Sequence, residues 1–168
     1  MNQKYRTMKN LQELFENQIK DLYSAETQLI NALSKMTDHA NDSNLKTVFD
    51  KHLEETKHHQ TVLKNICDEL NIKPTGEKCN AMEGLIKEAT EFISAAETDE
   101  VMDAGLIAEA QRIDHYEISG YGTAVRIAKE LGHNEIAMKL QKSLDDEYNS
   151  NKVLDRLAES RLNREAIA

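Results

Sequence analysis

Carboxylate and imidazole side chains interrupt the apolar patterns of this chain, and they are the residues best suited to chemistry. Glu26, Glu55, Glu117 and Glu147 each stand on a helical face that is otherwise largely apolar. Glu26 precedes Glu55 at nearly the same spacing as Glu117 precedes Glu147, which predicts two similar helical hairpins. Because an unpaired buried carboxylate costs several kcal/mol, four of them together require cations. The pattern predicts two divalent metal ions.

Histidines are expected to complete this site, and their spacing leaves more than one assignment open. His58 and His59 follow Glu55 by three and four positions, and we favour His59 because it lies on the more apolar stripe. His52 lies on the same stripe, either as a ligand or as a hydrogen-bonded histidine beside the site. Asp114 suits an inward ligand and a solvent-facing edge equally well. A single glutamate on such a stripe is more often an edge residue, so the metal hypothesis depends on the whole set.

The elements that position these residues are predicted to be helices. The 168 residues include only 6 Gly and 1 Pro, and strand-rich stretches are absent, which indicates an all-α chain. Apolar residues recur every three or four positions in four long segments and one shorter one. The expected helices cover about 11–36, 44–71, 80–93, 98–131 and 134–160.

Two tight hairpins are expected, one around Asp42 and one around Gly132, where Gly132 would provide a left-handed C-cap. The connection between the hairpins contains the short helix. Two antiparallel hairpins joined by one long crossover are typical of the ferritin-like four-helix bundle. We expect a single domain over residues 1–168, with a core over about 8–160 and frayed ends at 1–7 and 161–168.

Charge and composition argue against several classes of partner. The formal net charge of −9 disfavours nucleic acid and acidic lipid. No stretch approaches the roughly 20 apolar residues that a membrane-spanning helix needs, so we expect a cytoplasmic protein. Cys67 and Cys79 show no C-x-x-C pattern and are predicted to be reduced thiols.

Several segments, in this order, resemble those of a known family. They are Asp21-Leu-Tyr-Ser-Ala-Glu26, His52-Leu-Glu-Glu-Thr56, Ala81-Met-Glu-Gly-Leu-Ile86, Asp114-His-Tyr-Glu-Ile118 followed by Tyr121-Gly122, and Leu144-Asp-Asp-Glu147. Over about residues 8 to 160 the chain is similar to the bacterial YciF/YciE-like family of stress-associated ferritin-like proteins. The resemblance implies a homodimer.

The resemblance also implies metal ligands at Glu26, Glu55, His59, Glu117 and Glu147. The chain departs from the wider ferritin-like pattern, which has Glu-x-x-His in both the second and fourth long helices. Ser150 and Asn151 stand where the fourth helix would carry its histidine. This weakens the second metal site and makes Asp114 or His115 a candidate substitute.

The leading hypothesis is a dinuclear iron or manganese centre that handles dioxygen or peroxide. Glu55 and Glu147 would bridge the two ions, Glu26 and Glu117 would be terminal ligands, and His59 would be the neutral donor.

Two tyrosines accompany this predicted centre. Tyr23 lies one turn from Glu26, and Tyr121 lies one turn from Glu117. Either tyrosine would hydrogen-bond a ligand carboxylate, carry a radical or simply be a core residue with a satisfied hydroxyl.

Two other functions compete with this hypothesis. One is a metal-binding or structural stress protein without turnover. The other is a DNA-protecting mini-ferritin, which the negative charge disfavours.

Overall fold

The structure is a computed structural model that describes residues 7–76 and 78–167. The protein is built from helices. The long helices are α1 (Leu11–His39), α2 (Ser43–Glu69), α4 (Asp99–Glu130) and α5 (Asn134–Leu157). The shorter α3 (Asn80–Ala95) lies in the connection between α2 and α4. The described residues contain no strand, so the all-α prediction is confirmed. The predicted fraying of residues 1–6 and 168 lies outside the described residues.

Side chains at the helix starts explain several of these boundaries. Asn10, Asp42 and Thr98 each accept a hydrogen bond from a backbone N–H in the first turn that follows. These bonds satisfy amide groups that have no partner inside a helix. After α4, Gly132 adopts φ 78°, the left-handed conformation predicted from its position. The hairpin turns therefore lie where polar residues and glycine favour them.

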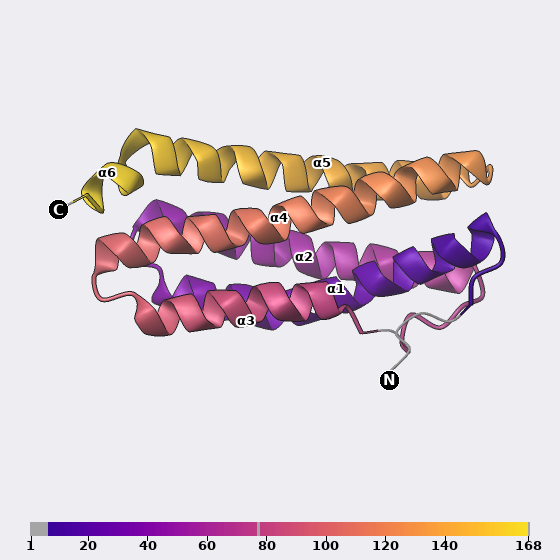
Figure 1. Cartoon of the computed structure of the whole chain (residues 1–168). Helices are drawn as coiled ribbons and strands as arrows, with labels where there is room; N and C mark the ends of the chain where they lie inside the picture. The colour runs from indigo at the N-terminus through magenta and orange to yellow at the C-terminus, as the bar shows by residue number, and fades with distance from the viewer. Residues whose placement is uncertain (1–6, 77, 168) are drawn as a thin grey trace.

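The long helices form two antiparallel pairs, α1 with α2 and α4 with α5 (Figure 1). The pairs pack together because α1 also contacts α4 and α2 also contacts α5. All four helices therefore surround a common interior. Helix α3 packs on the outside, against α1 and α4.

Two hydrophobic cores fill this interior, one toward each end of the long helices. One core contains Leu29, Leu33, Phe49, Leu106 and Leu154, among others. The second core contains Phe15, Ile19, Leu63, Ala124 and Leu140, among others. Buried polar residues occupy the part of each long helix that lies between these cores. The interior is thus apolar at both ends and polar near its middle.

The chain continues in an ordered way beyond α5. A π-helical turn, η1 (Ala158–Leu162), leads into the short α6 (Asn163–Glu165). Leu162 is only 2% exposed and belongs to the core that contains Phe49. Arg161 pairs with Asp42 at the start of α2. Residues 161–165 are therefore not frayed as predicted, because the chain there is helical, buries the apolar side chain of Leu162 and gains an ion pair.

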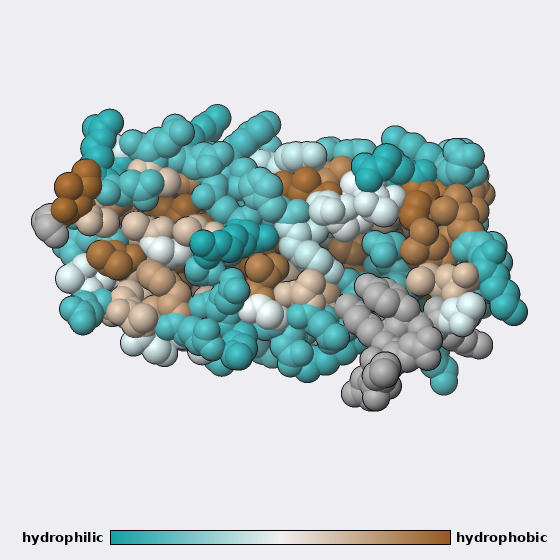
Figure 2. Space-filling view, in the orientation of Figure 1, coloured by the Kyte–Doolittle hydropathy of each residue, from teal (hydrophilic) through white to brown (hydrophobic). Residues whose placement is uncertain are grey.

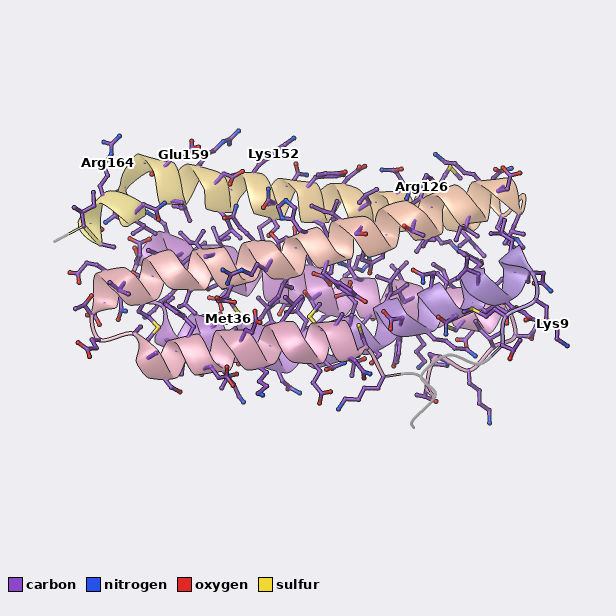
Figure 3. The ribbon with its side chains drawn as sticks, in the orientation of Figure 1. Lys9, Met36, Arg126, Lys152, Glu159 and Arg164 are labelled. Carbon is purple, nitrogen blue, oxygen red and sulfur yellow. The ribbon has the colours of Figure 1, made fainter. Side chains whose placement is uncertain are left out.

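The surface is mainly hydrophilic on the face that Figure 2 shows, with smaller hydrophobic areas between the polar side chains. Charged side chains such as Lys152, Glu159 and Arg164 point away from the helices (Figure 3). None of the helices in the described part of the chain combines the length and the apolar composition that a membrane span requires.

Candidate metal centre

Six ionisable side chains meet between the two hydrophobic cores, and each residue is at most 2% exposed. They come from all four long helices. The set consists of Glu26 from α1, His52 and His59 from α2, Asp114 and Glu117 from α4, and Glu147 from α5. We call this set the six-residue cluster. Such groups are almost never buried unless charge pairing or a metal compensates them.

The cluster divides into two overlapping groups, each close enough together to hold a metal ion. One group contains His52, Asp114, Glu117 and Glu147, and the other contains Glu26, His59 and Glu147. Within each group, one potential ligand atom from every residue lies within 4.8 Å of the others. Glu147 is the member that both groups share.

The contacts of Glu147 show how one carboxylate serves both groups. Its Oε2 lies 3.4 Å from Nε2 of His52, and its Oε1 lies 3.3 Å from Nδ1 of His59. The same Nδ1 lies 3.4 Å from Oε1 of Glu26. On the other side, Nδ1 of His52 lies 3.7 Å from Oδ1 of Asp114. The two oxygens of Glu147 therefore face different groups.

Most polar atoms of the cluster make no hydrogen bond to a described residue. Both carboxylate oxygens of Asp114, Glu117 and Glu147 lack a hydrogen-bond partner, and so does Oε2 of Glu26. His52 Nε2 and His59 Nδ1 are unpaired in the same sense. Buried polar atoms in folded proteins are normally satisfied, and carboxylate oxygens and imidazole nitrogens are ligands for iron, manganese and zinc. The residues present therefore fit divalent metal ions.

The carboxylates of the cluster differ strongly in their affinity for protons. Burial raises the pKa of Glu117 well above its usual value, and the negative charge of Glu147 raises it further. Burial also raises the pKa of Asp114 to about 7 and that of Glu26 in the same direction. Glu147 is the exception: burial would raise its pKa, but His52 and His59 lower it to about 2.

The two histidines are correspondingly good bases. Burial lowers the pKa of each, but neighbouring carboxylates outweigh burial and raise the pKa of His52 to about 9 and that of His59 to about 11. Without metal, protons on these histidines therefore balance part of the negative charge at neutral pH. A bound metal requires neutral imidazole, so metal binding would release these protons.

Each histidine also contacts a polar side chain on α5 that can hold its ring. His59 Nε2 lies 3.2 Å from Oδ2 of Asp146, whose side chain is 27% exposed. His52 Nδ1 lies 3.3 Å from the hydroxyl of Ser150. A hydrogen bond at one ring nitrogen fixes the orientation of the other, which faces the cluster.

One of the two predicted tyrosines lies at the cluster. Tyr121 is completely buried and donates a hydrogen bond of 2.5 Å to Oε1 of Glu26. Its ring centroid lies 5.7 Å from that of His59. Tyr23 is half-buried and packs against the core that contains Phe15. Among the described residues its hydroxyl makes no hydrogen bond to the cluster, so the hydrogen bond to a ligand carboxylate that was considered for Tyr23 is found for Tyr121 instead.

Glu55 was predicted to bridge two metals, and the structure does not bring it into the cluster. Its side chain is 21% exposed and lies 2.6 Å from Nζ of Lys51. The buried residue at this level of α2 is Thr56. Both Glu55 and Thr56 lie three or four positions from His52 and from His59, so either could share their face of the helix. The sequence-based prediction placed Glu55 on the inward face, but the structure places Thr56 there. The predicted convergence of four glutamates is therefore corrected to three, with Asp114 as the fourth carboxylate.

Burial also distinguishes the histidines that were candidate metal ligands. His59 lies in the cluster, whereas His58 is exposed on the next position of α2. His115 is exposed as well, and its Nδ1 lies 2.8 Å from the carbonyl oxygen of Gln111. Neither His58 nor His115 belongs to a candidate metal group among the described residues.

Residues 10–167 match a protein-family model described as "Domain of unknown function (DUF892)". The chain belongs to this family. It is 40% identical over 160 residues to Protein YciF of Escherichia coli K12, covering 95% of this chain and 96% of that protein. This agrees with the resemblance inferred from the sequence.

Solved structures of relatives have the same arrangement of helices. The crystal structure of the E. coli stress protein YciF matches with a TM-score of 0.88 at 40% identity, over 93% of this chain and 99% of that one. YcfI from Rhodopseudomonas palustris matches with a TM-score of 0.86 at 37% identity, over 89% and 96%. Protein XCC3681 from Xanthomonas campestris matches with a TM-score of 0.72 at 19% identity, over 94% and 100%, which shows the fold alone.

Sequence reasoning missed three polar residues of α2 and α5 that lie at this centre. Thr56 occupies the inward position that was assigned to Glu55, and its hydroxyl has no hydrogen-bond partner among the described residues. Ser150 was treated as a lost histidine, but it contacts His52, which comes from the facing helix. Asp146 was passed over, although a carboxylate beside an inward glutamate is well placed to hold a histidine.

Proposed function

We propose that this protein is a ferritin-like four-helix bundle that binds two metal ions, iron or manganese, and handles peroxide or dioxygen. The observation that carries the proposal is Glu147, whose two oxygens face two different groups of buried ligand atoms. One shared carboxylate with separate ligands on either side is the arrangement of dinuclear carboxylate centres. We also propose that the protein is located in the cytoplasm. The two cysteines, which are free and buried, would remain reduced there.

The chain's own residues would divide the work as follows. Glu26 and His59 would hold one ion, His52, Asp114 and Glu117 the other, and Glu147 both. Iron or manganese in this place would supply one-electron redox chemistry close to a bound oxidant. Tyr121 would fix the orientation of Glu26 through its hydrogen bond, and the two hydrophobic cores would exclude bulk water from the centre.

A role in stress is supported by the relative that matches over most of its length. YciF of E. coli is described as a stress protein. Peroxide and free iron are harmful together, so a centre that consumes one with the other fits such a role. We further propose a homodimer, as the family resemblance implies.

The main alternative is a metal-binding or structural stress protein without turnover. It is favoured by YcfI, which is described as a candidate structural protein. Stopped-flow measurement of Fe(II) oxidation by hydrogen peroxide separates the two functions. The proposal predicts faster oxidation with the protein than with free Fe(II), and it predicts that Glu147→Gln removes the acceleration. Oxidation no faster than that of free iron would contradict turnover.

A further inference from the structure

Thr56 of α2 is completely buried, and its hydroxyl makes no hydrogen bond to any described residue. A threonine inside a helix commonly donates its hydroxyl proton to the carbonyl oxygen four residues earlier. Other threonines of this chain do so, namely Thr27, Thr37, Thr47, Thr61 and Thr90. Because an unpaired buried hydroxyl is unfavourable, the exception at Thr56 indicates a partner that is not part of the chain.

The place of Thr56 on α2 puts it beside both candidate metal sites. It follows His52 by four positions and precedes His59 by three, so the three residues share one face of the helix. Neighbouring Cβ atoms on such a face lie about 5–6 Å apart. His52 belongs to one group of ligand atoms and His59 to the other. Thr56 therefore lies at the level between the two groups, where a bridging carboxylate was predicted.

Other hydroxyls at this centre already have partners. Tyr121 donates its proton to Glu26, and the hydroxyl of Ser150 lies 3.3 Å from Nδ1 of His52. The unpaired atoms of the six-residue cluster are carboxylate oxygens and ring nitrogens, which are suited to bind the metal ions themselves. Among the described residues at the centre, Thr56 thus offers a hydroxyl proton that nothing else in the chain accepts.

A hydrogen-bond donor at this level is suited to an anionic ligand. Two divalent ions would balance the charge of the four carboxylates in the cluster, so the formal charge of the centre would give an additional anion no net attraction. A donated hydrogen bond would stabilise such an anion, and bonds to charged acceptors are the stronger kind. Hydroperoxide carries a negatively charged oxygen and is a strong acceptor, whereas dioxygen is apolar and a weak one.

We propose that Thr56 donates a hydrogen bond to peroxide when peroxide binds at the metal centre. The inference rests on the proposed function, which supplies the metal ions, and it selects peroxide over dioxygen as the substrate. Burial holds the hydroxyl in place before the substrate arrives, so little rearrangement is needed on binding. Thr56 is thus a substrate-binding residue rather than a metal ligand.

Azide is a small anion that can take the place of hydroperoxide, and its affinity tests the proposal without turnover. The full chain is loaded with Fe(II), oxidised in air and titrated with azide, and the visible absorption of azide on ferric iron gives the dissociation constant. Thr56→Val replaces the hydroxyl by a methyl group of similar size. It should raise this constant about 10- to 100-fold, as expected for one hydrogen bond to a charged acceptor.

Two further variants separate the hydroxyl from the shape of the side chain. Thr56→Ser keeps the hydroxyl and should bind azide as the original protein does. Thr61→Val is the matched control, because Thr61 is exposed on the same helix and donates to the carbonyl oxygen of Lys57. Thr56→Ala gives the same comparison if the valine variant does not fold.

The choice of peroxide over dioxygen has its own measurement. Thr56→Val should slow the oxidation of Fe(II) by hydrogen peroxide more than its oxidation by dioxygen. Equal slowing with both oxidants would overturn the selection of peroxide.

Metal content and thermal unfolding of the same variants distinguish substrate binding from other roles. We expect Thr56→Val to keep two ions per chain. Its metal-free form should melt at the same temperature as the original protein or higher, because it lacks the unpaired hydroxyl. Unchanged azide affinity in Thr56→Val, or the loss of an ion, would overturn the role of Thr56 and leave a metal centre in the original protein. If the original protein binds neither iron nor manganese, the proposed function is wrong as well.

Discussion

Oε1 of Glu147 lies 3.3 Å from Nδ1 of His59, and the other oxygen of this carboxylate faces His52. Because Glu147 belongs to both candidate groups, Glu147→Gln should impair both metal sites. We expect the dissociation constant for Mn(II) to rise by more than about 100-fold, above the effect of residues that only orient a ligand. Isothermal titration calorimetry measures both the affinity and the number of ions.

Glu55→Gln is the matched control for this change. Glu55 pairs with Lys51 at the surface and lies outside both groups. We expect this variant to bind metal as the original protein does. Loss of both sites in Glu55→Gln, with little effect of Glu147→Gln, would favour the ligand set predicted from sequence over the one in the structure.

The difference between these two ligand sets shows what the sequence could and could not predict. The helices, their turns and the hairpin order follow from apolar periodicity, capping residues and Gly132, which are local signals. The sequence determines the inward face of α2 less well, because two neighbouring faces of this helix both carry apolar residues. One face contains Val48 and Val62, and the other contains Phe49 and Leu63. Only packing against the other helices selects Phe49, Thr56 and Leu63 as the buried set.

Side-chain contacts between different helices could not be predicted from the sequence either. The position of Ser150 suggested a missing histidine, and nothing local indicated that His52 would approach it from α2. The contact between Asp146 and His59 likewise joins residues that are far apart in the chain. Such pairings depend on how the two hairpins face each other, which one sequence does not specify.

Asp146 should strengthen metal binding by holding the ring of His59. Its hydrogen bond to Nε2 would keep Nδ1 free to coordinate, so Asp146→Asn should weaken metal binding by about 10–100-fold. Asp145→Asn is the control, because Asp145 is exposed and accepts a hydrogen bond from Gln141. ¹⁵N NMR of the metal-bound His59 ring would report which nitrogen carries the proton. An unchanged affinity in Asp146→Asn would show that Asp146 does not support the site.

The stability of the metal-free protein should fall as pH rises from about 5 to 9. Burial raises the folded-state pKa of Asp114 to about 7 and that of Glu117 well above its usual value. Burial lowers the pKa of both histidines, but the neighbouring carboxylates outweigh burial. They raise the pKa of His52 to about 9 and the pKa of His59 to about 11. In this pH range the folded state thus binds more protons than the unfolded state, so the free energy of unfolding decreases with pH.

Glu147 does not reverse this trend. Burial would raise its pKa, but His52 and His59 lower it to about 2, so the stability that it contributes changes only below about pH 4.5. We expect a loss on the order of a few kcal/mol between pH 5 and 9. Urea unfolding with a chelator or with Mn(II) measures it, and Mn(II) should flatten the profile by replacing the protons. A metal-free protein that becomes more stable over this range would contradict the pKa directions.

The docking of α3 depends on a close approach at Gly105. A Cβ atom there would lie 1.8 Å from Cζ of Phe92, a distance that no packing tolerates. Gly105→Ala should therefore destabilise the protein by about 1–3 kcal/mol, through displacement of Phe92. Gly84→Ala is the control, since nothing lies within 4 Å of its added Cβ, and it should stabilise helix α3 by roughly 0.5–1 kcal/mol. Thermal unfolding followed by circular dichroism measures the stability of both variants. Equal changes in stability for Gly105→Ala and Gly84→Ala would contradict the packing of α3 on α4.

Anomalous diffraction from crystals grown with Mn(II) or, without oxygen, with Fe(II) tests the central claim most directly. The account predicts two anomalous peaks per chain: one within ligand distance of Glu26 and His59, the other of His52, Asp114 and Glu117, with a Glu147 oxygen on each. A single peak, no peak, or peaks bound by residues outside the six-residue cluster would contradict it.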